Sequence, residues 1–263
     1  MMEEIYEFKH QKKKASWRLP IILLIVGLFL IGVSYFLLYS KFMKVNEFKI
    51  EGISTVDKNT LFGLLAAEVI RGESWRAFFG QDNLIFWLGV KNDSLKEKIP
   101  LLADLKLKTN LWEQRVEISV LERQFKGIWC LVKSQQCFIF DKEGVVFNVA
   151  PLAEGNLLLK VNDESNRSIN LGQLVLPDFS WFEKMFIVLD MIKKEEMLPA
   201  DIRIKDINLR EWEVTIFNGP RFIFSFESIP ENLSEIIKSL KNQLNFSKLY
   251  YIDFRIPGRI YYR

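Results

Sequence analysis

Histidine is almost absent from this chain of 263 residues: the one histidine is His10, near the amino terminus. Because the rest of the chain has no histidine base, a Ser-His or Cys-His nucleophilic arrangement is excluded there, and no metal site is expected. The chain also lacks a Ser-x-x-Lys motif and a glycine-rich phosphate-binding loop. We therefore expect no enzymatic activity, no cofactor and no small-molecule substrate.

Long blocks of one charge are also missing from the larger part of the chain. After residue 40, 31 Lys and Arg residues stand against 30 Asp and Glu residues, which argues against nucleic-acid binding. Adjacent carboxylates occur in polar segments, at Asp163-Glu164 and Glu195-Glu196, and we interpret them as solvated surface charges. A pair of carboxylates that folding brings together from distant positions stays an open alternative.

A long uncharged run is the strongest feature that the sequence does contain. Residues Leu19–Ser40 carry no charged side chain and are mostly Ile, Leu, Val and Phe. As a helix, these 22 residues span about 33 Å, enough to cross the hydrocarbon core of a bilayer. Trp17 and Tyr39 stand at its two ends, where aromatic rings favour the headgroup zone. We predict a transmembrane helix over 19–40; the alternative is a cleaved signal peptide, since Gly32-Val33-Ser34 is a small-x-small triplet.

The charges that flank this run predict its orientation. Five basic residues precede it closely, whereas only Lys41 and Lys44 follow it closely. Because excess Lys and Arg stay on the cytoplasmic side, residues 1–18 are expected to form a cytoplasmic tail that also meets lipid headgroups. The rest of the chain would lie outside the cytoplasmic membrane. The five preceding residues are Lys9, Lys12, Lys13, Lys14 and Arg18.

The two cysteines, Cys130 and Cys137, lie in this outer part of the chain. Each sits in an apolar stretch, and a polar turn at Lys133–Gln136 separates the stretches. This pattern is typical of a β-hairpin, and its spacing can place the thiols opposite one another. In an oxidising exterior the pair could form a cross-strand disulfide; two buried free thiols are the alternative.

Alternation and capping patterns predict a β-α-α-β-β domain over residues 44–123. Such an order favours a compact sheet with helices on one face. The expected elements are a strand at 45–53, a helix from Ser54 or Asp57 to 70, an apolar segment at 83–88, a helix at 93–98, and strands at 101–109 and 115–122.

Short strands, turns and two helices predict a mixed β-sheet domain over residues 124–263, so that the whole chain belongs to the α+β class. The turn Asp141–Gly144 and the dipeptide Asn218-Gly219 favour hairpins. The expected strands lie at 138–140, 145–147, 157–161, 202–209, 213–217, 222–226 and 250–262, and the expected helices at 179–197 and 230–245.

Aromatic residues gather at two places that could form a binding surface. In the last strand, apolar residues alternate with polar ones up to the Pro257-Gly258 interruption; such a terminal strand is either an ordinary closing strand or an open sheet edge that can accept another chain. The second group is either core or, in part, a surface that rests on the bilayer. Its members are Trp75, Phe78, Phe79, Phe86 and Trp87.

Four short motifs in order resemble a known family. After the basic tail and the apolar run, Val45–Ile53 (VNEFKIEGI) resembles the start of a POTRA domain in the bacterial cell-division proteins FtsQ/DivIB. Leu121-Glu122-Arg123 is similar to the "ER" that ends the last POTRA strand in that family. Phe138–Phe147 (FIFDKEGVVF) resembles a hairpin of its β-domain, and Tyr251–Arg255 (YIDFR) resembles its closing strand.

The resemblance implies a scaffold of the division complex rather than an enzyme. In the family, coiled-coil membrane proteins of the FtsB/DivIC and FtsL types are the partners, and the partner adds a strand against the last strand of the β-domain. Here this strand would run from Tyr250 to Arg255 and extend toward Arg259 and Arg263. Arg210 resembles a family arginine that pairs with an acidic partner residue. The implied contact residues are Tyr250, Tyr251, Ile252, Asp253, Phe254, Arg255 and Arg210.

A different function stays open for the same domain order. A membrane-anchored POTRA protein could handle polypeptides during secretion or envelope assembly. That alternative predicts a second POTRA repeat or an outer-membrane barrel, and this sequence contains neither.

Overall fold

The computed structural model describes residues 17–54, 56–91, 93, 98–151, 158–243 and 246–263. Most of the predicted cytoplasmic tail and most of the helix predicted for 93–98 therefore lie outside the described residues. The chain forms two compact units. The first comprises Met1–Lys49, Val69–Val90 and Lys108–Glu117, and the second comprises Ile50–Glu68, Lys91–Leu107 and Ile118–Arg263. The domain boundaries inferred from the sequence stay a prediction.

One apolar helix, α1 (Arg18–Tyr39), occupies the predicted span. Within it, Pro20–Tyr39 is long and apolar enough to cross a membrane, and none of this stretch is buried inside the protein. A signal sequence near an amino terminus shares these properties. The 3₁₀-helix η1 (Lys41–Met43) follows directly, and the Ser40 side chain accepts a hydrogen bond from the Phe42 backbone N–H at 3.1 Å.

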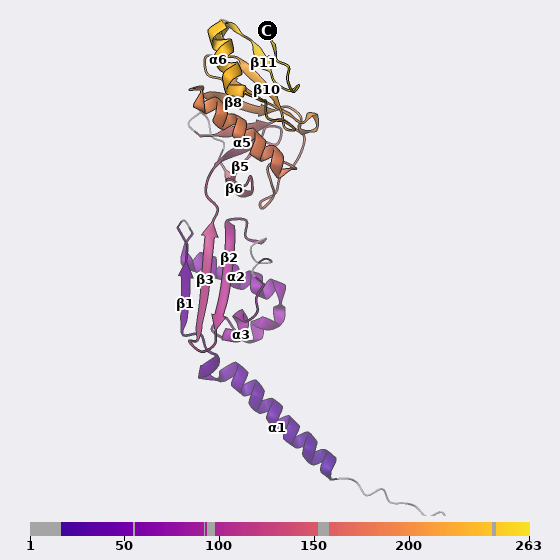
Figure 1. Ribbon diagram of the computed structural model, residues 1–263. Coiled ribbons are helices and arrows are strands. Elements are labelled where there is room, and N and C mark those ends of the chain that lie inside the picture. The colour runs from indigo at the N-terminus through magenta and orange to yellow at the C-terminus, as the bar shows by residue number, and fades with distance from the viewer. Residues whose placement is uncertain (1–16, 55, 92, 94–97, 152–157, 244–245) are drawn as a thin grey trace, which may run out of the picture. The chain divides into compact units, whose positions relative to one another are not determined.

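A three-stranded sheet with the order β1-β3-β2 follows α1. Its strands are β1 (Glu47–Glu51), β2 (Leu102–Asn110) and β3 (Arg115–Glu122). Between β1 and β2 lie α2 (Lys58–Gly72), η2 (Ser74–Phe78) and α3 (Leu84–Trp87) (Figure 1). Helix α2 lies where a helix was predicted, whereas α3 falls in the segment 83–88 that was predicted only as apolar.

Local chemistry explains where these elements start. Asp57 begins α2, because its carboxylate accepts hydrogen bonds from the backbone N–H groups of Asn59 and Thr60 at 3.0 and 3.1 Å. Gly52, after β1, has a φ of +85°, and a Cβ there would lie 1.9 Å from the Val120 carbonyl oxygen. Only glycine fits this turn.

The larger sheet has nine strands in the order β12-β11-β10-β9-β8-β7-β4-β5-β6. It mixes parallel pairs, such as β4 with β7, with antiparallel ones, such as β9 with β10. The mixed α+β fold is confirmed. The strands are β4 (Gly127–Leu131), β5 (Gln136–Phe140), β6 (Val146–Ala150), β7 (Lys160–Asp163), β8 (Pro199–Ile204), β9 (Glu211–Ile216), β10 (Arg221–Ser225), β11 (Tyr251–Asp253) and β12 (Tyr261–Tyr262).

Two amphipathic helices, α5 (Phe179–Lys194) and α6 (Leu233–Gln243), pack on one face of this sheet (Figure 1). Together with inward-facing strand residues, they form one continuous apolar core that includes Trp129, Phe140 and Trp212. The 3₁₀-helices η3 (Ile207–Leu209) and η4 (Phe246–Lys248) complete the connections. Burial of this core is the main force that holds the sheet together.

Candidate functional site at the sheet edge

The predicted contact strand is β11, which pairs in parallel with β10. Phe222 lies opposite Ile252 in this register. Ile252 is fully buried and Phe254 is 4% exposed, so both belong to the core and are not available to a partner. Tyr250, by contrast, is 70% exposed, and Tyr251 is half-buried. The predicted alternation is therefore present, and it separates side chains buried in the core from side chains at the surface.

Of the two alternatives for the terminal strand, the open edge is not found at Tyr250–Arg255, because the chain's own end pairs with β11. Strand β12 pairs antiparallel with β11, and the backbone N–H of Tyr250 donates to the carbonyl oxygen of Arg263 at 2.6 Å. The reversal is made at Pro257-Gly258: Gly258 has a φ of +72°, and the N–H of Arg259 donates to the Ile256 carbonyl oxygen at 3.1 Å. The outermost strand has only two residues, Tyr261 and Tyr262.

A carboxylate–guanidinium cluster lies at the end of β11. Arg255 binds Asp253 through several hydrogen bonds, the shortest 2.7 Å long, and also binds Glu211 at the start of β9. Burial raises the pKa of Asp253, but the hydrogen bonds and charge of Arg255 outweigh it, so that this pKa lies below its ordinary value. The same hydrogen bonds, to Asp253 first and Glu211 second, raise the pKa of Arg255. Both groups are therefore firmly charged at neutral pH.

Arg210 lies next to Glu211 and has its own internal partner. Its side chain is 59% exposed, pairs with Glu227 at 2.5 Å and stands 5.9 Å from the Trp181 ring. The structure thus brings Arg210 and Arg255 close to Glu211, the first as its neighbour in the chain and the second through an ion pair.

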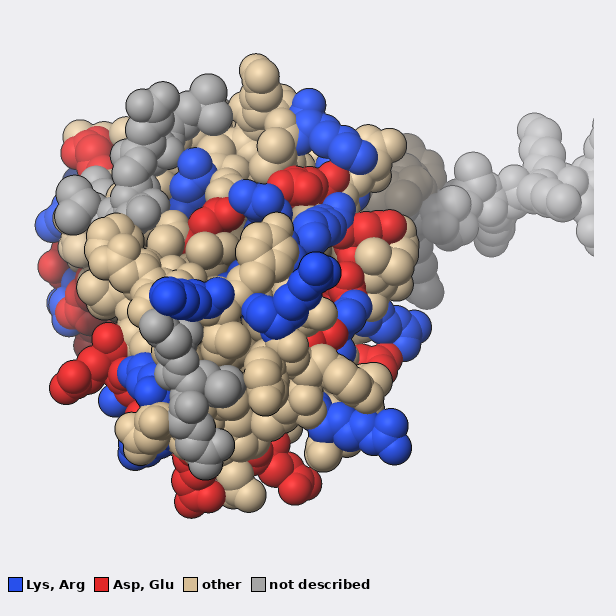
Figure 2. Space-filling view, turned by 90° about the horizontal axis from the view of Figure 1, so that it is seen from above, with Lys and Arg blue, Asp and Glu red and all other residues tan. Residues whose placement is uncertain are grey.

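Exposed tyrosine and arginine side chains dominate the surface around β11 and β12. Tyr250, Tyr261 and Tyr262 are 70%, 45% and 52% exposed, and the guanidinium of Arg221 lies 5.4 Å from the Tyr250 ring centre. Figure 2 shows the molecule from above, with Lys and Arg side chains near the middle of the face among residues that carry no charge and a few Asp and Glu side chains.

The other quoted motifs also have defined structural roles. Glu122 is 7% exposed and accepts hydrogen bonds from Ser54 N–H, Ser54 Oγ and Val56 N–H. Arg123 donates to Asp141 of the hairpin motif, and their side chains are 10% and 4% exposed. Asp141 in turn accepts hydrogen bonds from the N–H groups at 143 and 145 at 3.0 and 2.9 Å. The "ER" motif and the hairpin motif are therefore joined by a buried ion pair.

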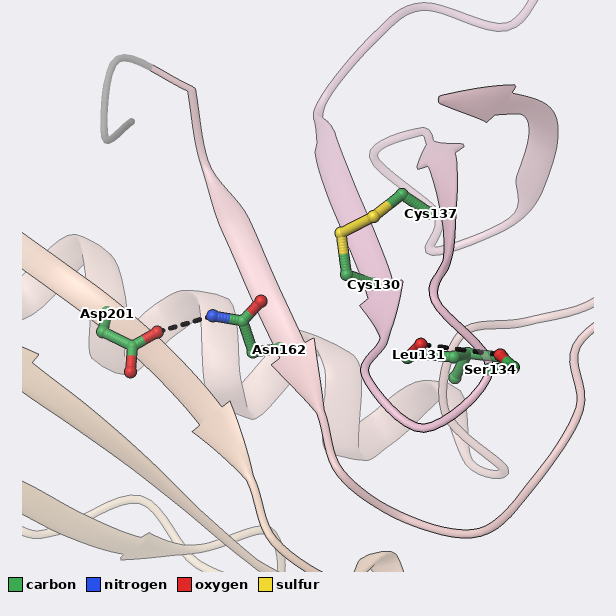
Figure 3. Close-up of a disulfide and its surroundings, with 6 residues drawn as sticks. All are labelled: Cys130, Leu131, Ser134, Cys137, Asn162 and Asp201. Atoms are coloured by element: carbon green, nitrogen blue, oxygen red, sulfur yellow. Dashed lines mark hydrogen bonds between the residues drawn. A yellow bond between two sulfur atoms is a disulfide. The ribbon is translucent and has the colours of Figure 1, made fainter. Parts of the chain in front are cut away.

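The cysteines form the disulfide of the β4–β5 hairpin. Cys130 and Cys137 are directly opposite in the register, with their Cα atoms 4.0 Å apart (Figure 3). They lie on the sheet face opposite α5 and α6, because strand neighbours alternate and Trp129 faces that core. Next to them on this face, Asn162 donates a hydrogen bond to Asp201 at 2.7 Å (Figure 3).

One acidic pair expected at the surface lies partly in the core. Asp163 is fully buried, and its carboxylate accepts hydrogen bonds from Trp129 Nε1 at 3.2 Å and Arg167 Nε at 2.8 Å. The surface interpretation of Asp163 was wrong. A sequence pattern does not show that Arg167, four residues later, folds back and neutralises the Asp163 carboxylate. In the described part of the chain, no group of three or more His, Cys, Asp or Glu residues is placed to hold a metal ion.

The second aromatic group, at residues 75–87, divides into core and surface. Phe86 and Trp87 are fully buried, whereas Trp75 is 46% and Phe78 is 84% exposed. Sequence reasoning missed Asn83, which is 3% exposed and whose side chain forms hydrogen bonds with two helices. Its Nδ2 donates to the Leu37 carbonyl oxygen of α1 at 2.8 Å, while its Oδ1 caps α3 at the Ile85 N–H.

No model of a known protein family matches this chain, and no curated protein matches it.

Proposed function

We propose that this chain is a single-span membrane scaffold of the bacterial division complex, similar to FtsQ/DivIB. It would bind FtsB/DivIC-like and FtsL-like membrane proteins at the cytoplasmic membrane of the division site, with its amino terminus inside. Its action would be strand addition rather than catalysis. The observation that carries the proposal is the position of β11, a parallel strand next to the end of the large sheet.

Several further features support the proposal. One helix, α1, has the length and composition of a membrane anchor. Helices α2 and α3 lie between β1 and the pair β2 and β3, an order that supports a POTRA-like domain, although the second helix predicted for it, at 93–98, lies mostly outside the described residues. Arg123 and Asp141, each from a motif that resembles the family, form one ion pair. A disulfide at 130–137 favours an oxidising compartment outside the cytoplasm.

The partner strand would take the place of β12. A strand that adds to a sheet needs a row of unpaired N–H and C=O groups, and β12 occupies that row on β11. Because β12 has only two paired positions and both its tyrosines are about half exposed, its displacement loses little buried surface. A longer partner strand could then bond with β11 and with the residues up to Arg255.

The first test compares edge variants for binding to the FtsB-like protein of the same organism. Exposed Tyr250 and half-buried Tyr251 are changed together to glutamate, which leaves the buried Ile252 and Phe254 in place. We expect the Kd to rise about tenfold or more, because the changed ring contacts lie at the centre of the interface. Isothermal titration of the purified full chains in detergent measures this change.

The matched control is Val149→Glu on β6, the strand at the opposite end of the same sheet. Val149 is 60% exposed, so the substitution adds a charge to the surface with little effect on folding. Its Kd should equal that of the wild type. If both variants bind like the wild type and remain folded by circular dichroism, the edge-strand proposal fails.

Deletion of residues 256–263 tests whether the partner replaces β12. Removal of an internal competitor exposes β11 permanently, so we expect the partner to bind as tightly as before or more tightly. Loss of binding would show instead that the partner pairs with β12 itself.

A further inference from the structure

Trp112 is the most exposed tryptophan in the described part of the chain, at 88%. It lies in the turn between β2 and β3, where the Asn110 side chain accepts hydrogen bonds from the N–H groups of Trp112 and Glu113 at 3.1 and 3.2 Å. Gln114 completes the turn with a φ of +51°. The conformation of the turn therefore depends on Asn110 and Gln114, and not on packing of the Trp112 indole ring.

The same turn is bonded to η1, which directly follows α1. The Gln114 side-chain amide donates to the carbonyl oxygens of Lys41 and Phe42 at 3.1 and 3.0 Å. The Gln114 carbonyl oxygen accepts from the Asn46 N–H at 2.7 Å. These residues all belong to the first compact unit. The turn that carries Trp112 is thus held against the chain as it leaves α1.

Aromatic rings continue from α1 to Trp112. Phe36, in the last turn of α1, stacks on Phe42 with ring centres 6.4 Å apart. Phe42 meets Trp112 edge to face, again at 6.4 Å. Phe36 and Phe42 are 46% and 40% exposed, so this row of three rings is open on its outer side.

Lengths place this row at the boundary of a bilayer. The apolar stretch Pro20–Tyr39 has 20 residues and measures about 30 Å, the thickness of the hydrocarbon core. Phe42 follows three residues later, and a 3₁₀-helix rises about 2 Å per residue, so Phe42 lies at most about 6 Å beyond the core. The headgroup zone on each side is about 5–7 Å deep. Because the Trp112 ring contacts Phe42, it also comes to the headgroup zone, which indole rings favour.

Local charges agree with this placement. Arg115 pairs with Glu47 at 2.9 Å and with Glu113 at 3.2 Å, so one cation offsets part of the negative charge of the carboxylates nearest the turn. Lys41 and Lys44 are exposed on the segment that Gln114 binds. Two basic side chains at this level attract lipid phosphates.

We propose that the β2–β3 turn is a second membrane contact, in which Trp112 inserts into the outer headgroup zone beside the end of α1. The contact rests on the proposed anchoring of α1 in a bilayer. Its effect is to restrain the angle between α1 and the rest of the first compact unit, since a span attached at one point alone could swivel.

Fluorescence quenching in vesicles tests this contact directly. The full chain is reconstituted into phosphatidylcholine–phosphatidylglycerol vesicles whose acyl chains carry bromine near the headgroup. The wild type, Trp112→Phe and Trp17→Phe are compared, because each difference spectrum isolates one tryptophan. We expect brominated lipid to quench the Trp112 component, and aqueous iodide to quench it several-fold less than it quenches free tryptophan.

The Trp17 component separates the two possible failures. Trp17 is the N-cap residue of α1, so brominated lipid quenches it whenever α1 is anchored in the bilayer. Quenching of Trp17 together with full iodide access to Trp112 would overturn the second contact and leave the anchor intact. If neither tryptophan is quenched by brominated lipid, the anchor proposal itself fails, and the second contact fails with it.

Discussion

At the scale of residues, the buried polar side chains have the most specific roles. Asn83, Glu122 and Asp163 are each less than 9% exposed, and each has at least two hydrogen bonds. An unpaired polar group in these places would cost roughly 1–3 kcal/mol, so each of these residues also determines where its partners must lie. Substitution of such a residue removes all of its hydrogen bonds and leaves each of the groups it bonded without that partner.

Asp253 gives the residue-scale prediction, which concerns pH. Because its pKa is lower in the folded chain than the ordinary 3.8, its contribution to stability is fully present above that pH. The contribution is lost as the pH falls through the lower folded-state pKa. We expect Asp253→Asn to destabilise the protein at neutral pH, and the difference from the wild type to shrink in acid. Urea unfolding across the acid range measures it; a constant difference at all pH values would contradict it.

At the scale of elements, alternation and capping predicted most strands and helices, because each depends on neighbours in sequence. Strand β3 occurs exactly where the pattern RVEISVLE predicts it, with Val116, Ile118 and Val120 buried. Helix α5 begins at the predicted residue because Asp178 caps the Ser180 N–H. A tertiary partner decided between the two predicted caps of α2: Ser54 binds Glu122, and Asp57 caps the helix.

The β4–β5 hairpin gives the element-scale prediction. Its disulfide closes a short loop of sequence separation 7, which limits the freedom of the unfolded chain. Replacement of both cysteines by alanine should lower the free energy of unfolding by about 2–3 kcal/mol. Denaturant unfolding with and without reductant measures the change. Reductant should destabilise the wild type and have no effect on the variant. If it destabilises both proteins, its effect does not come from this disulfide.

At the scale of the whole molecule, the proposed topology predicts a protease-protection pattern. With an epitope tag at the amino terminus, protease added to intact spheroplasts should remove everything after α1 and leave a tagged fragment of about 40 residues. Deletion of residues 18–40 should abolish this fragment and release the chain from the membrane fraction. Full protection of the intact chain would contradict the placement of the folded part outside the membrane.

The sequence by itself determined the apolar span, the hairpin around the cysteines, the α+β class and most element positions, because periodicity, turn chemistry and capping act over a few residues. Only the tertiary structure decided which surfaces are open. The return of β12 onto β11, the burial of Asp163 beside Arg167, and the approach of Trp112 to Phe42 each join residues that local patterns treat separately. Backbone pairing and charge neutralisation across the fold select these arrangements, and they decide what remains available to a partner or a bilayer.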